Sequence, residues 1–149
     1  MLDHPEDFVG RRWLDVGAGS GLVALAAARG GARAGAIDLD PVAGVAARMN
    51  AALNRLAIDS QTGDAFQALP AVDGVFLADV TYEAELLRRV EMWCAQCREA
   101  GIEVYVADPG RGFVQRSSLA PRLEPRSVHW ASADVGEAHR VETMVWRLQ

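Results

Sequence analysis

Short hydrophobic runs alternate along the chain with longer segments in which apolar residues recur every three or four positions. The runs have the length of buried strands, and the periodic segments have the spacing of amphipathic helices. Strands are expected at residues 13–16, 34–39, 72–79 and 102–107, with a weak additional strand within 57–63. Helices are expected at 21–29, from 41 to about 56, before Gly101, and at 116–123, followed by two strands at 126–132 and 139–148.

This order of elements predicts a single α/β domain over residues 1–149. Its core is a doubly wound, Rossmann-like and mostly parallel sheet of seven strands, which ends in a C-terminal antiparallel hairpin. Ligands of such sheets bind where the strands end at their carboxyl edge. The residues expected at that edge are Gly17–Gly21, Asp38, Asp64, Asp79–Tyr82 and Asp108–Arg111.

Two of the helices carry a clear apolar pattern. Pro41 is expected at the first helical position after an Asp40 N-cap. The stripe that this helix is expected to bury comprises Val42, Val45, Ala46, Met49, Leu53 and Leu56. In the helix before Gly101, Cys94 and Cys97 continue the helical spacing of Val90 and Trp93, so we interpret both thiols as core residues rather than as a zinc or redox pair.

Composition and charge limit the kinds of molecule that the protein is expected to bind. The 149 residues are half hydrophobic and carry a net charge of −5, and all fifteen basic residues are arginines. Basic pairs occur only at Arg11–Arg12 and Arg88–Arg89, which argues against a nucleic-acid partner. The three histidines are scattered, so no metal site is expected, and no apolar run is long enough to cross a membrane. With an acidic start, these features predict a soluble, cytoplasmic protein, and they leave its oligomeric state open.

The turn after the first strand is rich in glycine. Gly17, Gly19 and Gly21 form a G-x-G-x-G pattern between an apolar run and an alanine-rich helix. Such a turn lets a nucleotide approach the backbone closely. The dinucleotide fingerprint would place its third glycine at Leu22, so the spacing favours S-adenosylmethionine over NAD.

Together with Asp15 before the loop and Asp38 at the end of the next strand, this pattern resembles the class I S-adenosylmethionine-dependent methyltransferases. Asp38 is placed to accept hydrogen bonds from ribose hydroxyls. Gly63–Asp64 resembles the acidic loop that contacts adenine in these enzymes. The cofactor-binding residues that the resemblance implies are Asp15, Gly17, Gly19, Gly21, Asp38, Asp64 and Asp79.

A carboxylate and a phenol follow the fourth strand. The D-x-x-Y spacing of Asp79 and Tyr82 resembles that of the seven-β-strand protein lysine methyltransferases. The resemblance implies a catalytic pair, in which Asp79 holds the incoming ammonium group and Tyr82 lines its channel. Glu83 and Glu85 would add to a negative field suited to a cationic substrate. The alternative interpretation is that Asp79 caps the following helix and Tyr82 packs against it.

Four segments, at residues 50–56, 78–83, 108–111 and 143–147, together resemble the lysine methyltransferases of the electron transfer flavoprotein β-subunit. The resemblance implies that this subunit is the protein partner. Members of that family carry a further N-terminal segment, whereas about a dozen residues precede the first strand here. The alternatives are a small-molecule N-methyltransferase acting on a nicotinamide-like amine, and a truncated cofactor-binding domain without turnover. The acceptor lysine and the role of Arg111 are not decided by the sequence.

Overall fold

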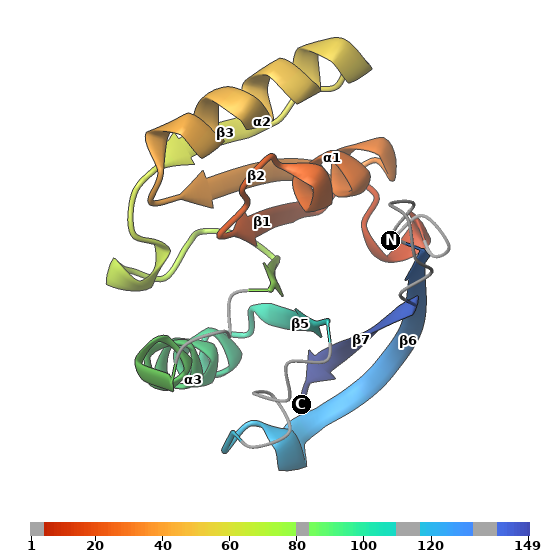
Figure 1. The fold of residues 1–149 in the computed structure, drawn as a ribbon. Coiled ribbons are helices and arrows are strands. Elements are labelled where there is room, and N and C mark those ends of the chain that lie inside the picture. Colours follow the sequence, from red (N-terminus) through yellow and green to blue (C-terminus); the bar gives the residue numbers. More distant parts are fainter. Residues whose placement is uncertain (1–4, 80–83, 110–116, 133–139) are drawn as a thin grey trace.

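The computed structural model describes residues 5–79, 84–109, 117–132 and 140–149, and in these ranges it forms one seven-stranded sheet with the order β3-β2-β1-β4-β5-β7-β6 (Figure 1). The strands are β1 (Arg12–Val16), β2 (Arg33–Asp38), β3 (Asp59–Thr62), β4 (Gly74–Ala78), β5 (Glu103–Asp108), β6 (Leu123–Ser132) and β7 (Arg140–Leu148). The helices are α1 (Leu22–Arg29), α2 (Pro41–Asn54) and α3 (Ala84–Glu99), with 3-10 turns η1 (Pro5–Asp7), η2 (Ala65–Gln67) and η3 (Ala120–Arg122). The predicted fold class is confirmed.

The pairing of the strands brings their carboxyl ends to one edge. β3, β2, β1, β4 and β5 run parallel, and Val16 at the end of β1 lies opposite both Ile37 of β2 and Leu77 of β4. β7 is antiparallel to both β5 and β6, which confirms the predicted hairpin. The loops that follow β1, β2, β3 and β4 therefore begin at the same edge of the sheet.

Alternate residues of the strands build a core on each face of the sheet. On one face Val75 and Leu77 of β4 pack with the buried side of α3. On the other face Phe76 packs with Trp13 and with alanines of α1. Cys94 and Cys97 are fully buried in the α3 core, as predicted, and burial raises the pKa of both thiols, that of Cys97 to about 12.

An aromatic cluster fills the α1 face of the central strands. The rings of Trp13 and Phe76 stack with centroids 4.7 Å apart, and Phe8 lies tilted against both rings. The Trp13 ring also occupies the space in which a Cβ at Gly74 would lie. Glycine at the start of β4 thus allows the indole to lie flat on the strand.

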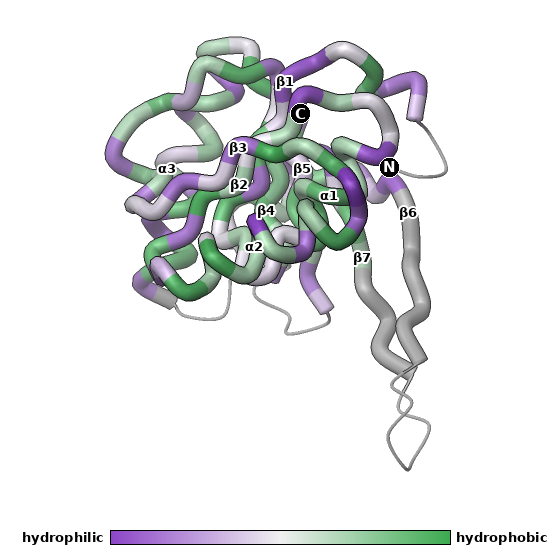
Figure 2. Tube along the Cα trace, turned by 90° about the horizontal axis from the view of Figure 1, so that it is seen from above, coloured by the Kyte–Doolittle hydropathy of each residue, from purple (hydrophilic) through white to green (hydrophobic). Residues whose placement is uncertain are grey.

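The predicted apolar stripe of α2 is wrong. The residues that α2 buries are the small ones, Gly44, Ala47 and Ala51. Val42, Val45, Met49 and Leu53 are exposed, and Ala46 and Leu56 are half-buried. A Cβ at Gly44 would lie 3.3 Å from Thr62 Oγ1, so α2 packs too closely on β2 and β3 for large side chains to fit between them. Figure 2 shows that hydrophobic residues recur along the trace of α2.

The helix predicted at 116–123 is also wrong within the described residues. Residues 117–119 form a bend and a turn, η3 is a single 3-10 turn, and β6 begins at Leu123. Pro121 explains the difference, because its ring lacks an N–H and would clash with the carbonyl one α-helical turn earlier. No helix in the described ranges has the length and apolar character needed to cross a membrane.

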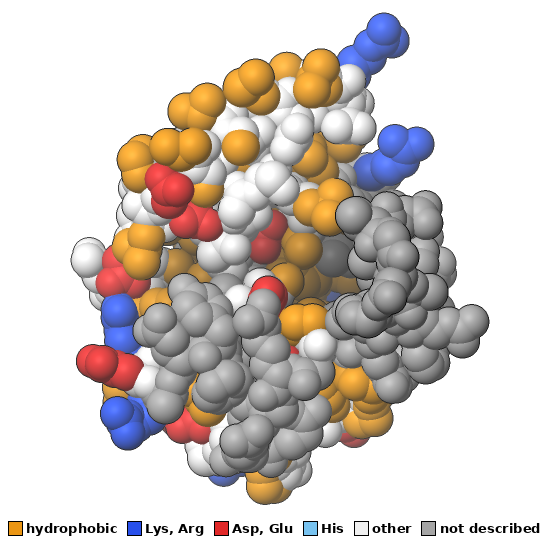
Figure 3. Space-filling model, in the orientation of Figure 1, with side chains coloured by type: hydrophobic (Ala, Val, Ile, Leu, Met, Phe, Trp, Pro, Cys, Tyr) orange, Lys and Arg blue, Asp and Glu red, His pale blue; other side chains and the backbone are white. Residues whose placement is uncertain are grey.

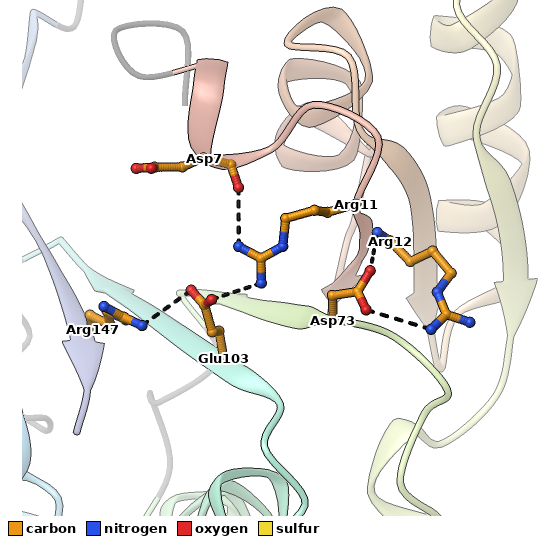
Figure 4. Close-up of polar contacts among 6 residues, drawn as sticks. All are labelled: Asp7, Arg11, Arg12, Asp73, Glu103 and Arg147. Carbon is orange, nitrogen blue, oxygen red and sulfur yellow. Dashed lines mark hydrogen bonds and ion pairs between the residues drawn. The ribbon is translucent and has the colours of Figure 1, made fainter.

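Charged side chains join the strands at the opposite edge, where β1, β4 and β5 begin (Figure 4). Glu103 forms two ion pairs. Its Oε1 lies 2.7 Å from the Arg11 guanidinium, and its Oε2 lies 3.5 Å from that of Arg147. Asp73 accepts a hydrogen bond from the backbone N–H of Arg12, which lowers its pKa, and it also pairs with the Arg12 guanidinium. These contacts lie across the sheet from the glycine-rich loop, so we interpret them as structural.

Candidate functional site

The loop between β1 and α1 is held on β2 by its own backbone. The N–H groups of Gly17 and Ala18 both donate to the carbonyl oxygen of Ile37, at 2.9 and 3.2 Å. Gly17, Gly19 and Gly21 all have positive φ angles, of 68°, 52° and 78°. A Cβ at Gly19 would meet no atom within 4 Å, so the loop leaves open space beside its backbone. This open cradle fits the approach of a nucleotide cofactor.

Helix α2 supports the same loop from behind. A Cβ at Gly21 would lie 2.8 Å from the Cβ of Ala47, so the third glycine allows α1 and α2 to approach closely. One turn further along α2, the Asn50 side chain donates to the carbonyl oxygen of Ser20 at 3.0 Å. Sequence reasoning gave Asn50 no role. The signal that could have found it is its place on the helix next to the small, buried residues at 47 and 51.

Asp38 ends β2 and bridges two loops. Its Oδ2 accepts from the N–H of Gly19 at 2.8 Å, and its Oδ1 accepts from the N–H of Asp40 at 2.9 Å. Asp40 in turn caps α2 by accepting from the N–H of Val42 at 2.8 Å, as predicted. Each carboxylate oxygen can accept more than one hydrogen bond, so a ribose contact at Asp38 stays a prediction that this geometry allows.

Asp15 lies beneath the loop and not on its surface. Its side chain is 2% exposed and accepts from the N–H of Ala24 in α1 at 3.1 Å. Burial raises the pKa of Asp15 to about 7, the Ala24 hydrogen bond lowers it, and the charge of Asp38 raises it. In the structure Asp15 therefore fixes the first turn of α1 behind the glycines.

Asp64 follows β3 and begins η2. It accepts from the N–H of Phe66 at 3.0 Å and from the Arg89 guanidinium at 2.7 Å, and Arg89 also lies over the Phe66 ring. The hydrogen bond from Arg89 is the main reason why the pKa of Asp64 is lowered. The N–H of Gly63 donates to the Asp38 carbonyl at 2.8 Å, so the loops after β2 and β3 are joined. The adenine contact predicted for Asp64 stays a prediction.

Asp79 follows β4 directly. Its side chain is exposed, its φ is 57°, and its N–H donates to the carbonyl oxygen of Ala107 at 3.0 Å. A positive φ is uncommon outside glycine and is best tolerated by Asp and Asn. Tyr82, Glu83 and Arg111 lie outside the described residues, so their predicted roles are not placed by the structure.

The structure thus brings four of the predicted positions to one edge: the glycine loop, Asp38, Asp64 and Asp79. Among the described residues no group of three or more histidines, cysteines and carboxylates is arranged to hold a metal ion. Because the edge combines an open glycine turn with carboxylates and backbone N–H groups, its chemistry suits a nucleoside with hydroxyl and amine groups.

The family model described as ribosomal protein L11 methyltransferase (PrmA) matches residues 4–80, which is just over half of the chain. The matched segment contains the glycine loop, Asp38 and Asp64. The chain belongs to this methyltransferase family. S-adenosylmethionine is accordingly its cofactor, as the spacing of the glycines predicted.

Two curated relatives are similar over almost the entire chain. The electron transfer flavoprotein beta subunit lysine methyltransferase of Danio rerio is 31% identical over 99% of this chain and 59% of its own length. Its counterpart in Xenopus laevis is 32% identical over 100% of this chain and 63% of its own length. The chain therefore spans about three-fifths of the length of these relatives. The resemblance inferred from the four sequence segments is confirmed.

A solved structure, that of Thermoplasma acidophilum 1320, shares the fold. It superimposes with a TM-score of 0.73 at 17% identity, covering 99% of this chain and 84% of that chain. This likeness confirms the arrangement of the sheet and helices.

Proposed function

We propose that the protein is an S-adenosylmethionine-dependent protein-lysine N-methyltransferase and that its substrate is the electron transfer flavoprotein β-subunit. The names of the two relatives support this substrate. The observation that carries the catalytic part is the position of Asp79, an exposed carboxylate at the end of β4. Because β4 pairs directly with β1, Asp79 directly follows the strand next to the one that leads into the glycine loop.

The cofactor would be held by the open face of the loop at Gly17 and Gly19, with Asp38 toward its ribose and Asp64 toward its adenine. When bound, S-adenosylmethionine supplies an activated methyl group on a sulfonium. The protein then has to orient the acceptor amine and exclude water, because displacement at the methyl carbon needs no covalent catalyst. Asn50 and Asp15 contribute by fixing the loop and the first turn of α1.

The role that we assign to Asp79 is to hold the lysine ammonium group by a charge-assisted hydrogen bond. An ammonium group must lose its proton before the nitrogen can attack, and Asp79 acts as a positioner rather than as a strong base. The left-handed backbone at Asp79 sets the direction of its Cα–Cβ bond at the end of the strand. Tyr82 is proposed as its partner on the channel wall.

The test is a transfer assay with methyl-labelled S-adenosylmethionine, purified flavoprotein β-subunit and, separately, nicotinamide. Asp79→Asn is the informative variant, because Asn tolerates the positive φ while removing the charge. Asp59→Asn, on the exposed edge strand β3, removes an equal charge away from the site. We expect label on lysines of the subunit, at least a tenfold loss of methyl transfer with Asp79→Asn while cofactor binding stays largely intact, and no effect of Asp59→Asn.

The outcomes separate the alternatives. Label in nicotinamide and none in the subunit would support the small-molecule methyltransferase instead. Tight cofactor binding without label in either acceptor would support a binding domain without turnover. Equal activity of Asp79→Asn and the unsubstituted protein would contradict the role of Asp79 while leaving the substrate proposal intact.

A further inference from the structure

Arg89 of α3 holds the loop that follows β3. Its guanidinium lies 2.7 Å from Oδ2 of Asp64 and also lies over the Phe66 ring, 5.4 Å from the ring centroid. One turn further along α3, the Trp93 ring lies nearly perpendicular to that of Phe66, and its Nε1 donates to the carbonyl oxygen of Ala68 at 3.3 Å. Figure 3 shows acidic and basic side chains next to one another on the edge of the molecule between α2 and α3. Helix α3 thus holds the whole segment from Asp64 to Ala68.

The Asp64 carboxylate is held at both of its oxygens. Oδ1 accepts from the backbone N–H of Phe66 at 3.0 Å, and Oδ2 accepts from the Arg89 guanidinium at 2.7 Å. With the first bond alone, the carboxylate could turn about its terminal torsion, which has no sharp preference. The charge-assisted bond from Arg89 fixes its plane. Each oxygen can accept a further hydrogen bond, so Asp64 presents acceptor positions in fixed directions.

A ligand can reach Asp64. Its side chain is 17% exposed, and together with Ala65 and Ile37 it lines an open groove. The loop also begins beside the predicted ribose contact, because Asp38 of β2 pairs with Thr62, two residues before Asp64. A nucleoside with its ribose at Asp38 therefore has this loop beside its base.

A carboxylate in a fixed orientation selects one class of base. When ionised it only accepts hydrogen bonds. It therefore binds the exocyclic amine of adenine and repels the carbonyl oxygen that hypoxanthine carries at the same position. A carboxylate that is free to turn can move away from that oxygen and discriminates less. The selectivity between the two bases thus depends on what holds Asp64 in place.

We propose that Arg89 is a positioning residue for the base of the cofactor: it holds the Asp64 carboxylate so that the site accepts adenine and rejects a purine with a carbonyl group at C6. The inference rests on the proposed placement of the adenine beside Asp64. It is independent of the methyl acceptor, because it concerns the cofactor alone. Arg89 acts through Asp64 and does not itself contact the base.

Isothermal titration calorimetry with S-adenosylhomocysteine and S-inosylhomocysteine measures this selectivity without a methyl acceptor. We expect the unsubstituted protein to bind the adenine ligand about ten times more tightly, or better. Arg89→Met removes the donor and the charge but keeps a flexible side chain that can lie over Phe66. It should lower the ratio of the two Kd values to about threefold or less. Arg89→Lys keeps the charge and one donor group, so it should restore part of the ratio.

Arg88→Met is the matched control. Arg88 is the neighbouring arginine on α3 and is exposed, whereas the hydrogen bond to Asp64 comes from Arg89. The control should keep the ratio of the unsubstituted protein. A general loss of structure would weaken both ligands alike and would leave the ratio unchanged. An unchanged ratio in Arg89→Met therefore overturns the proposal.

Asp64→Asn separates this inference from the placement of the adenine. The amide can accept from an amine or donate to a carbonyl, so the variant should lose the selectivity. Adding Arg89→Met to it should lower the ratio no further, because Arg89 acts through the carboxylate. Loss of selectivity with Asp64→Asn but not with Arg89→Met would overturn the role of Arg89 alone. Loss with neither variant would overturn the adenine placement as well.

Circular dichroism and the melting temperature check that each variant is folded. Folding is expected for the Arg89 variants because that side chain is 44% exposed. The transfer assay with the flavoprotein β-subunit stays a separate measurement. A protein that shows the expected selectivity but methylates no lysine would support the role of Arg89 and contradict only the proposed substrate.

Discussion

Asn50 donates a hydrogen bond from its side-chain Nδ2 to the carbonyl oxygen of Ser20, at 3.0 Å. Asn50 lies in α2, and Ser20 lies in the glycine-rich loop between β1 and α1, 30 residues earlier in the chain. The bond fixes the part of the loop that leads into Gly21, next to the contact between Gly21 and Ala47. The shape of the candidate cofactor cradle therefore depends on a helix that follows a different strand.

Removing this bond is expected to weaken cofactor binding. Asn50→Ala leaves the Ser20 carbonyl without its side-chain donor and frees the loop, so the Kd for S-adenosylmethionine should rise by about 3- to 10-fold. Asn54→Ala is the matched control, because the Asn54 side chain donates to the Asn50 carbonyl within α2 and not to the loop residue Ser20. Isothermal titration calorimetry measures both. Equal affinity of the Asn50→Ala variant and the unsubstituted protein would show that the loop does not need the bond.

Two glycines of the loop should respond differently to a methyl group. Gly21→Ala meets Ala47 at 2.8 Å as well as an unfavourable φ, so it should destabilise the fold by about 2–4 kcal/mol. Gly19→Ala has only the φ penalty, of about 1–2 kcal/mol, but its methyl group would lie in the open cradle. We expect Gly21→Ala to lower the melting temperature more, and Gly19→Ala to fold and bind S-adenosylmethionine poorly. The opposite ranking in stability would contradict the packing argument.

Asp15 should make the stability of the fold depend on pH. Its pKa of about 7 in the folded chain lies above the ordinary value of 3.8, so the folded state binds the proton more tightly. The resulting stabilisation is fully present below about pH 4, falls as the pH rises, and is lost above about pH 7. Asp15→Asn keeps an acceptor for the Ala24 N–H and removes the titration.

Urea unfolding at a series of pH values tests this expectation. The free energy of unfolding should fall less steeply between about pH 4 and pH 7 in Asp15→Asn than in the unsubstituted protein. Asp59→Asn, at an exposed position, should retain the steeper profile. Parallel profiles for all three proteins would rule out Asp15 as the source of the pH dependence.

The ion pairs at the opposite edge of the sheet should affect stability without affecting the site. Glu103→Gln removes the charge that Arg11 and Arg147 share, and all three side chains are partly exposed. The expected loss is about 1 kcal/mol or less, and it should shrink at high salt. Chemical unfolding at low and high salt measures the loss, and calorimetry should show unchanged cofactor affinity. A weakened cofactor affinity would show that this edge is coupled to the glycine loop.

The order of strands and helices could be predicted from the sequence because apolar residues recur at a different spacing in strands and in helices. Residues that start or stop an element also mark its ends. The run at 74–78 is apolar throughout because β4 is buried on both faces. Asp40 followed by Pro41 located the start of α2. The carboxyl edge followed from the fold, because parallel strands place all their C-terminal loops together.

The face that α2 buries could not be predicted from its hydrophobic period. The rule assumes that large apolar residues are buried, but the space beside β2 and β3 admits only Gly44, Ala47 and Ala51. Likewise, the contact between Asn50 and Ser20 depends on how α1 and α2 pack, which cannot be inferred from the residues of either helix alone. A helix was expected at 116–123 in place of the η3 turn because its apolar spacing is helical. Pro121, which disfavours the interior of an α-helix, was the residue that argued against it.

The contact between Trp13 and Gly74 has a consequence for mutational tolerance. The indole is almost fully buried and lies where any β-carbon at position 74 would have to go, so even alanine forces the ring or the strand to move. The two residues pair near the starts of central, neighbouring strands, where the close-packed sheet has little freedom to adjust. In a saturation library selected for folding, glycine at position 74 should be the one surviving residue, although it lies far from the glycine-rich loop.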